Sequence, residues 1–260
     1  MIEFALVILA GTILSKGSSL FSNFKHIEFK GSIVDLSFLL KVRQVQLIPI
    51  IGNCISVIRS DGQSRIKLAL NTIIELVGPI SIITIYYQYD ITFDFFFKSL
   101  WILIFLTLGG IDLNSRKLPN YIIFPLLLVL LFMSPFWNTI GYERQMFGYN
   151  QFIGSIINTG FISVGLLLFW MGIYYAYPDS MGGGDIKLII VIGLFFGFSG
   201  ALITMYLSII AAAVFSIIKM MLTKKSSVAI PFGSVLSLAS ILVIVAEDKL
   251  QQVYQFIFLG

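Results

Sequence analysis

The stretch IKLIIVIGLFFGFSGALITMYLSIIAAAVFSIIKMML at residues 186–222 carries charge only at Lys187 and Lys219. A bilayer is crossed by about 20 apolar residues, so this stretch is long enough to span a membrane. The whole 260-residue chain has the same character, because 58% of its residues are hydrophobic, 12% are charged and the mean hydropathy is +0.96. Soluble domains carry roughly 25% charged residues. The composition therefore excludes a soluble enzyme and predicts an all-α polytopic membrane protein.

Eight apolar segments of this kind occur along the chain, and each is expected to form one span. Their approximate ranges are 2–15, 69–88, 93–111, 121–137, 151–176, 186–198, 200–222 and 228–246. The sixth segment is short and ends in a glycine-rich sequence, which favours a partly re-entrant segment. We divide the chain into residues 1–68, a first span with a basic loop, and residues 69–260, a membrane-embedded domain.

The basic residues predict the orientation of these spans. In the eight-span topology only Lys98, Arg144 and Lys249 lie on one side of the membrane, and the other 14 of the 17 basic residues lie on the opposite side. Because loops rich in Lys and Arg face the cytoplasm, both termini are expected outside and the loop 16–67 inside. The net charge of +4 thus indicates orientation and contact of this loop with anionic membrane lipid, in preference to nucleic-acid binding.

Three carboxylates are expected at membrane depth, where an ionisable group costs about 2.5–3.5 kcal/mol and needs a partner or a function. They are Glu75 in the second span, Asp112 at the inner end of the third and Asp185 at the inner start of the sixth. The other acidic residues of the membrane region fall at outer ends or in loops, where solvation accounts for them.

Asp112 closes an apolar run and is followed by Arg116 and by the sequence Leu118-Pro119-Asn120. A proline is readily accommodated in the first turn of a helix, so the next span is expected to begin there. On this fragment alone, a structural role for Asp112 as a helix cap or as the partner of Arg116 is an equal alternative.

Asp185 follows the triplet Gly182-Gly183-Gly184. Glycines permit backbone torsions that are closed to other residues, and they let another backbone come close. We expect the triplet to form a tight turn beside a substrate, with Asp185 in the first turn of the following helix, where its anionic form is favoured. The alternative is a plain capping carboxylate after a flexible loop.

The predicted topology places Asp112 and Asp185 on the cytoplasmic side at similar depth. Two carboxyls in a partly dry site do not both ionise easily, so one can hold a proton as an acid while the other activates water as a base. This is the chemistry of aspartyl peptide hydrolysis, which uses no metal. The single Cys54 and the single His26 can build neither an internal disulfide nor a cysteine- or histidine-rich zinc site.

Gly182-Gly183-Gly184-Asp185-Ile186-Lys187-Leu188 resembles the GxGDxKL signature of type IV prepilin peptidases, which are membrane aspartyl proteases. Asp112 with Leu118-Pro119-Asn120 is similar to their first catalytic aspartate and the motif that follows it. The resemblance covers roughly residues 45–240. Its further points of agreement are Leu47–Ile50, Ile74–Gly78 and Ile230–Gly233.

The resemblance implies that Asp112 and Asp185 are catalytic. It implies an active-site loop made of Gly182, Gly183, Gly184 and Lys187, with support from Glu75, Pro119 and Asn120. Members of the family remove the short basic leader of prepilins or pseudopilins on the cytoplasmic face of the bacterial inner membrane. Many members then methylate the new N-terminus with S-adenosylmethionine.

The sequence departs from the family in two places. Many members carry two CxxC pairs that look like a zinc site, whereas Cys54 stands alone here, so zinc is not expected. The GSFLNV-like stretch after the first span is distorted at Gly17–Ser22, which leaves methylation with S-adenosylmethionine an open second activity.

Two other functions fit an apolar chain with a glycine loop. The first is a non-enzymatic transporter or assembly-platform subunit that uses the loop as a hinge, although transporters usually place ionisable residues near the midplane of the membrane. The second is a presenilin-like protease with transmembrane substrates, which the residues around Asp112 argue against.

Overall fold

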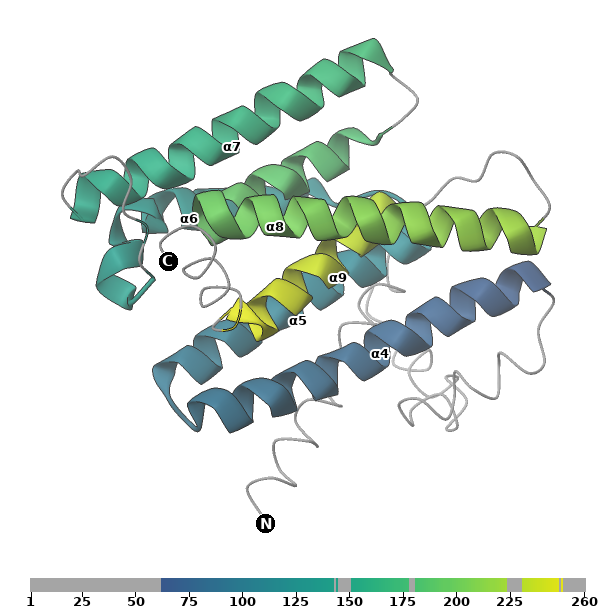
Figure 1. Cartoon of the computed structure of the whole chain (residues 1–260), viewed down its shortest axis with the longest axis horizontal. Coiled ribbons are helices and arrows are strands. Elements are labelled where there is room, and N and C mark those ends of the chain that lie inside the picture. The colour runs from purple at the N-terminus through teal and green to yellow at the C-terminus, as the bar shows by residue number, and fades with distance from the viewer. Residues whose placement is uncertain are drawn as a thin grey trace, which may run out of the picture. The chain divides into compact units, whose positions relative to one another are not determined.

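The computed structural model describes residues 62–142, 144, 151–177, 181–223, 231–247 and 249 of the chain. All regular secondary structure in this part is helical (Figure 1), as the composition predicts. The predicted first span 2–15 and most of the basic loop lie outside the described residues. The helices, in chain order, are α4 (Gly62–Tyr89), α5 (Phe93–Ser115), α6 (Asn120–Met133), the 3-10 helix η3 (Ser134–Ile140), α7 (Gln151–Ala176), α8 (Gly183–Thr223) and α9 (Phe232–Val245).

Four helical segments within the described residues are long and apolar enough to cross a membrane. They are Phe93–Ser115, Asn120–Ile140, Phe152–Ala176 and Gly183–Met221. α9 is apolar but shorter, and α4 covers the predicted second span. The all-helical membrane architecture is confirmed, whereas the count of eight spans stays a prediction.

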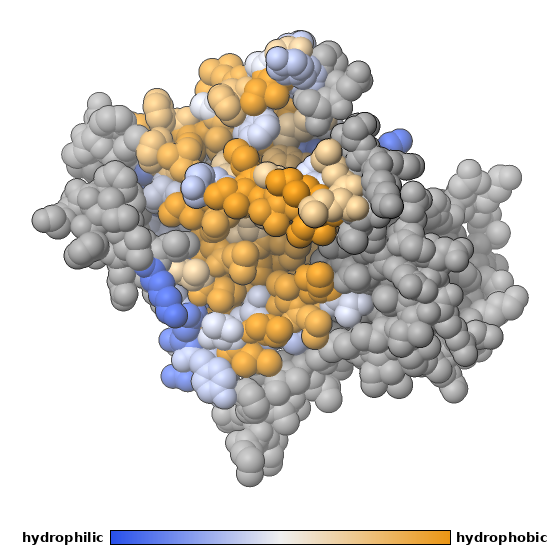
Figure 2. All heavy atoms as spheres, turned by 45° about the vertical axis from the view of Figure 1, so that its right-hand side comes forward, coloured by the Kyte–Doolittle hydropathy of each residue, from blue (hydrophilic) through white to orange (hydrophobic). Residues whose placement is uncertain are grey.

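The described surface carries many large hydrophobic side chains, which Figure 2 shows as broad orange areas. Phe132 and Met221 are each 75% exposed, and Leu168 is 67% exposed. Soluble monomers rarely leave contiguous apolar areas of this kind in water. Exposed apolar side chains on helices of this length are what contact with lipid tails requires.

The chain forms two compact units, residues 1–115 with 244–260, and residues 116–243. In the first unit α4 and α5 form an antiparallel pair whose interface buries Ile85 and Phe105 completely. α4 ends at Tyr89. The next residue, Asp90, adopts the left-handed conformation (φ 48°) typical of the residue that follows a helix.

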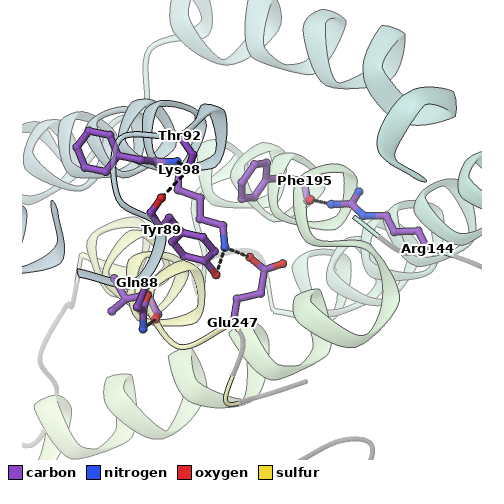
Figure 3. A network of polar contacts seen from close by, with 9 residues as sticks. Gln88, Tyr89, Thr92, Lys98, Arg144, Phe195 and Glu247 are labelled. Atoms are coloured by element: carbon purple, nitrogen blue, oxygen red, sulfur yellow. Dashed lines mark hydrogen bonds and ion pairs between the residues drawn. The ribbon is translucent and has the colours of Figure 1, made fainter. Parts of the chain in front are cut away.

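A buried lysine joins the C-terminal segment to this helix pair. Lys98 on α5 forms an ion pair with Glu247 (Nζ to Oε2, 2.9 Å) and donates a hydrogen bond to the Tyr89 hydroxyl at 2.6 Å (Figure 3). Lys98 is 4% exposed, so this cation is not a solvated charge at the membrane edge. The prediction that solvation alone accounts for Glu247 is therefore wrong.

In the second unit α7 and α6 both pack on α8. α7 lies very close to α8 at Gly193, where a Cβ atom would meet the Ser163 hydroxyl oxygen at 2.8 Å. A residue larger than glycine would push the two helices apart.

α8 is interrupted at Gly197, which has φ 67° and ψ −164°. Its 41 residues would make a straight helix about 60 Å long, twice the thickness of the hydrocarbon core. Figure 1 shows the chain turning back at this break, so that the two halves of α8 run in different directions. The sequence places the division between two segments at 198–200, within a few residues of this break.

An arginine from the segment before α7 binds two backbone carbonyls just before the break. Arg144 donates to the Leu194 carbonyl at 3.0 Å and also to the Phe195 carbonyl (Figure 3). Its guanidinium carbon lies 3.9 Å from the centre of the Trp137 ring, and the side chain is buried. Beyond the break, Asn158 accepts a hydrogen bond from the Phe198 amide at 2.8 Å.

Candidate active site

Asp112 lies in the last turn of α5, three residues before the helix ends at Ser115, and is 3% exposed. Two neighbouring side chains bind the carbonyls of this turn: Asn114 donates to Gly110 at 3.0 Å and Ser115 donates to Ile111 at 2.7 Å. The chain then leaves the helix through Arg116, whose φ of 50° is unusual for a non-glycine residue. The Asp112 carboxyl is thus almost completely buried at a helix end, and burial of a charged group is costly unless it has a partner or a proton.

Asp185 lies in the first turn of α8 and is half-buried. Its Oδ2 accepts a hydrogen bond from the Gly182 amide at 3.3 Å, and its own amide donates to the Gly182 carbonyl at 3.0 Å. This reciprocal contact resembles a capping interaction at a helix start. The capping alternative for Asp185 is therefore partly right, and it is compatible with a chemical role because a capped carboxylate is held in one orientation.

The glycine triplet lies at the start of α8 and has ordinary backbone torsions. Gly183 and Gly184 already belong to α8, and Gly182 is the residue before it. In the described part of the chain the glycines with positive φ are Gly141 and Gly197, so none of the triplet uses a torsion closed to other residues. The triplet therefore does not supply unusual torsions, because the helix begins inside it, and the tight turn itself stays a prediction, since residues 178–180 lie outside the described residues.

The prediction that the triplet lets another backbone come close holds for one of its members. A Cβ atom on Gly184 would lie 3.2 Å from the Leu118 Cβ and 3.4 Å from the Leu118 backbone nitrogen. A Cβ on Gly183 would meet nothing within 4 Å, and one on Gly182 would meet only the Asp185 carboxylate, at 3.5 Å. Gly184 is therefore required by packing inside the protein, whereas a side chain on Gly183 would meet none of the residues that the structure describes.

The two predicted motifs meet in the second unit. Lys187 donates a hydrogen bond from Nζ to the Asn120 Oδ1 at 2.8 Å, and its ammonium lies 5.0 Å from the centre of the Phe124 ring. Pro119 is buried at the start of α6, and its carbonyl accepts hydrogen bonds from the amides of Ile122 and Ile123. The structure thus brings Gly184, Lys187 and Asn120 into one cluster with Leu118.

The remaining predicted site residues lie in the first unit. Asp112 ends α5 there, and Glu75 lies within α4, where the structure describes the helix but not this side chain. The meeting of the Asp112 and Asp185 carboxyls stays a prediction. Within the described ranges, His, Cys, Asp and Glu side chains form no group of three that could hold a metal ion. Cys54 and His26 lie outside those ranges, so the expectation of no zinc also stays a prediction.

Sequence reasoning treated Arg144 and Lys98 as charges of the outer loops, and missed that both are buried partners of other segments. Arg144 binds the Leu194 carbonyl 50 positions away and Lys98 binds the Glu247 carboxylate near the other end of the chain, and no local pattern signals either contact. The role of Leu118 as the neighbour of Gly184 was also missed.

The chain was compared with known proteins. The model of the Type IV leader peptidase family matches residues 99–217, a range that includes both Asp112 and Asp185. The chain is 30% identical over 160 residues to a prepilin leader peptidase/N-methyltransferase of Aeromonas salmonicida, with 59% of this chain and 50% of the relative covered. It is 26% identical over 150 residues to the protein of that name from Pseudomonas aeruginosa, with 57% and 49% covered.

The chain therefore spans about half the length of the curated relatives it matches. No solved structure matches the chain.

Proposed function

Because the model of the Type IV leader peptidase family matches residues 99–217, we propose that the protein is a membrane aspartyl endopeptidase of this family. Its substrates in this proposal are type IV prepilins or pseudopilins, from which it removes the basic leader at the cytoplasmic face of the bacterial inner membrane. One observation carries the proposal: the family match includes both predicted catalytic aspartates and the motifs that pack together in the second unit.

In this proposal the Asp112 and Asp185 carboxyls act as a pair. The ionised carboxyl takes a proton from a water molecule, whose oxygen attacks the carbonyl carbon of the scissile peptide, and the protonated carboxyl donates its proton to the carbonyl oxygen. The C–N bond then breaks and the leaving nitrogen receives the proton taken from water. Because the two groups share protons, the pair titrates as a unit.

The glycines and the neighbouring side chains have separate tasks. Gly184 keeps the start of α8 against Leu118, and the substrate backbone would pass Asp185 at Gly183, where no described residue comes within 4 Å of an added Cβ. Lys187, Asn120 and Pro119 hold the two motifs in place. Glu75 supports the site or orients the substrate, as the resemblance implies.

The cytoplasmic placement rests on the basic residues. Two of the three cations predicted on the opposite side, Lys98 and Arg144, are buried and engaged within the protein. Without these two buried residues, Lys249 is the one basic residue predicted on the outer side, against 14 predicted on the inner side. We therefore keep residues 1–68 as a span with an inner loop that touches anionic lipid, residues 69–260 as the peptidase domain, and no nucleic acid as a partner.

The names of the relatives include a second activity, N-methyl transfer. S-adenosylmethionine would supply the methyl group for the new N-terminal amine, and the two carboxyls would cleave the leader without it. The distorted stretch at residues 17–22 lies outside the described residues, so no residue of this chain is assigned to that cofactor.

The test is cleavage of a prepilin by the purified protein in detergent, with and without S-adenosylmethionine. Mass spectrometry of the product is expected to show a new N-terminus after the basic leader in both reactions, with little or no added methyl group. A substrate that stays intact with folded protein would contradict the peptidase proposal and favour the transporter or assembly-platform alternative. A product heavier by about 14 Da, the mass of one methylene group, would show that methyl transfer is retained.

A further inference from the structure

Lys187 lies two positions after Asp185 on α8 but does not share its side of the helix. Residues two apart on an α-helix do not face each other, because each residue turns by about 100°. The ammonium of Lys187 is instead 2.8 Å from the Asn120 Oδ1 and 5.0 Å from the centre of the Phe124 ring, both on α6. Its contacts are therefore directed away from the carboxylate and toward another helix.

A second contact between the same two segments lies on the other side of Asp185 in the sequence. Gly184 meets Leu118 at the distance where a single added carbon would be tight, 3.2 Å from its Cβ. The first turns of α8 thus contact the segment 118–120 at two places. Gly184 packs on Leu118, and Lys187 binds Asn120, the first residue of α6. Two attachments that flank one residue fix the rotation of the turn that carries it.

We propose that Lys187 is a positioning residue that acts through Asn120 to set the orientation of the Asp185 carboxylate. It contacts neither the substrate nor the reacting atoms. This inference rests on the proposed function, since it assigns a task within that catalytic site. A displacement of about 1 Å in a catalytic group can cost about 100-fold in rate. Loss of a contact that holds this turn in place is therefore expected to lower the rate measurably, even when the carboxylate moves by only a fraction of that distance.

A double-mutant cycle on the full-length protein tests the inference. Lys187→Met and Asn120→Leu are each expected to lower kcat for prepilin cleavage by about five- to tenfold, because each removes one hydrogen bond to a charged group, and to leave KM unchanged. The double variant is expected to be no slower than either single variant, since both changes break the same contact. Lys219→Met, on the other half of α8, is the matched control and is expected to keep wild-type kcat.

The conservative variants supply the rescue. Lys187→Arg keeps a donor and Asn120→Asp keeps an acceptor, so both are expected to stay within about threefold of wild-type kcat. If either apolar variant fails to accumulate, the conservative variants test the inference by themselves. A large loss of kcat in both conservative variants would overturn the inference.

Two other results would overturn it. Losses that multiply in the double variant would show that Lys187 and Asn120 act independently. A rise in KM at unchanged kcat for Lys187→Met alone would show that Lys187 binds the substrate. Asp185→Asn in the same assay distinguishes a failure of this inference from a failure of the proposed function. Cleavage that survives this change would contradict the proposed catalytic site itself, whatever the outcome of the cycle.

Discussion

The two regions that carry the aspartates lie at opposite kinds of helix end. Asp112 closes α5, where backbone carbonyls lack intrahelical partners, and it is 3% exposed. Asp185 opens α8, where amides lack partners, and it is half-buried beside the open space at Gly183. The two carboxyls therefore differ in their surroundings: the first is almost completely buried, whereas the second caps the start of its own helix and is flanked by contacts with Leu118 and Asn120.

The largest difference between the two regions is expected when each aspartate side chain is lengthened by one methylene group. Asp112→Glu must fit into a closed environment and is expected to lower kcat by about 100-fold or more, whereas Asp185→Glu at the open site is expected to lower it by about tenfold. Steady-state cleavage of a prepilin measures both, with protein amount and thermal unfolding as controls. A larger loss for Asp185→Glu would show that the open region is the more constrained one.

The glycines give the next effect. Gly184→Val is expected to lower cleavage strongly, because its side chain meets Leu118, while Gly183→Val introduces the same residue where the protein itself leaves space. For Gly183→Val we expect a folded protein whose main defect is a higher KM, since the added side chain meets the substrate. Equal losses in kcat for the two variants would show that the triplet is a uniform linker.

A third effect concerns stability away from the aspartates. Arg144→Gln removes the donors that bind the Leu194 and Phe195 carbonyls at the break in α8, and should lower the free energy of unfolding by about 2 kcal/mol. Thermal unfolding in detergent measures the change, and Arg116→Gln at an exposed position is the control. Unchanged stability of the Arg144 variant would mean that Gly197 alone determines the break.

The smallest effect is expected from removing metal ions. Cleavage by two carboxyls uses no metal, so the rate should be unchanged after treatment with EDTA and after addition of zinc. A loss of cleavage with EDTA that zinc restores would contradict the mechanism.

The sequence predicted the parts of this molecule that depend on local pattern. Apolar runs located α5, α6 and α7, and a glycine-rich stretch located the break in α8. The two short motifs include Lys187 and Asn120, but their hydrogen bond was not predicted. The residues that escaped prediction depend on distant partners. Arg144 and Lys98 read as loop charges because nothing near them in the sequence reveals the carbonyls or the Glu247 carboxylate that they bind.

The expectation of unusual torsions in the glycine triplet failed for a different reason. Three glycines in a row are compatible with a turn and with a helix start, and a helix start is chosen here because Gly184 can then pack on Leu118. A pattern of residue types does not contain that choice, since it depends on a segment more than 60 positions earlier in the chain.

The most direct test of the catalytic pair is the removal of one carboxyl at a time. Asp112→Asn and Asp185→Asn keep the shape of the side chain, and mass spectrometry of prepilin incubated with each purified, folded variant is expected to show no leader removal. Asp94→Asn, at the far end of the helix that carries Asp112, is the matched control and should cleave as the wild-type protein does. Near-normal cleavage by either the Asp112 or the Asp185 variant would contradict the claim that these two carboxyls perform the hydrolysis.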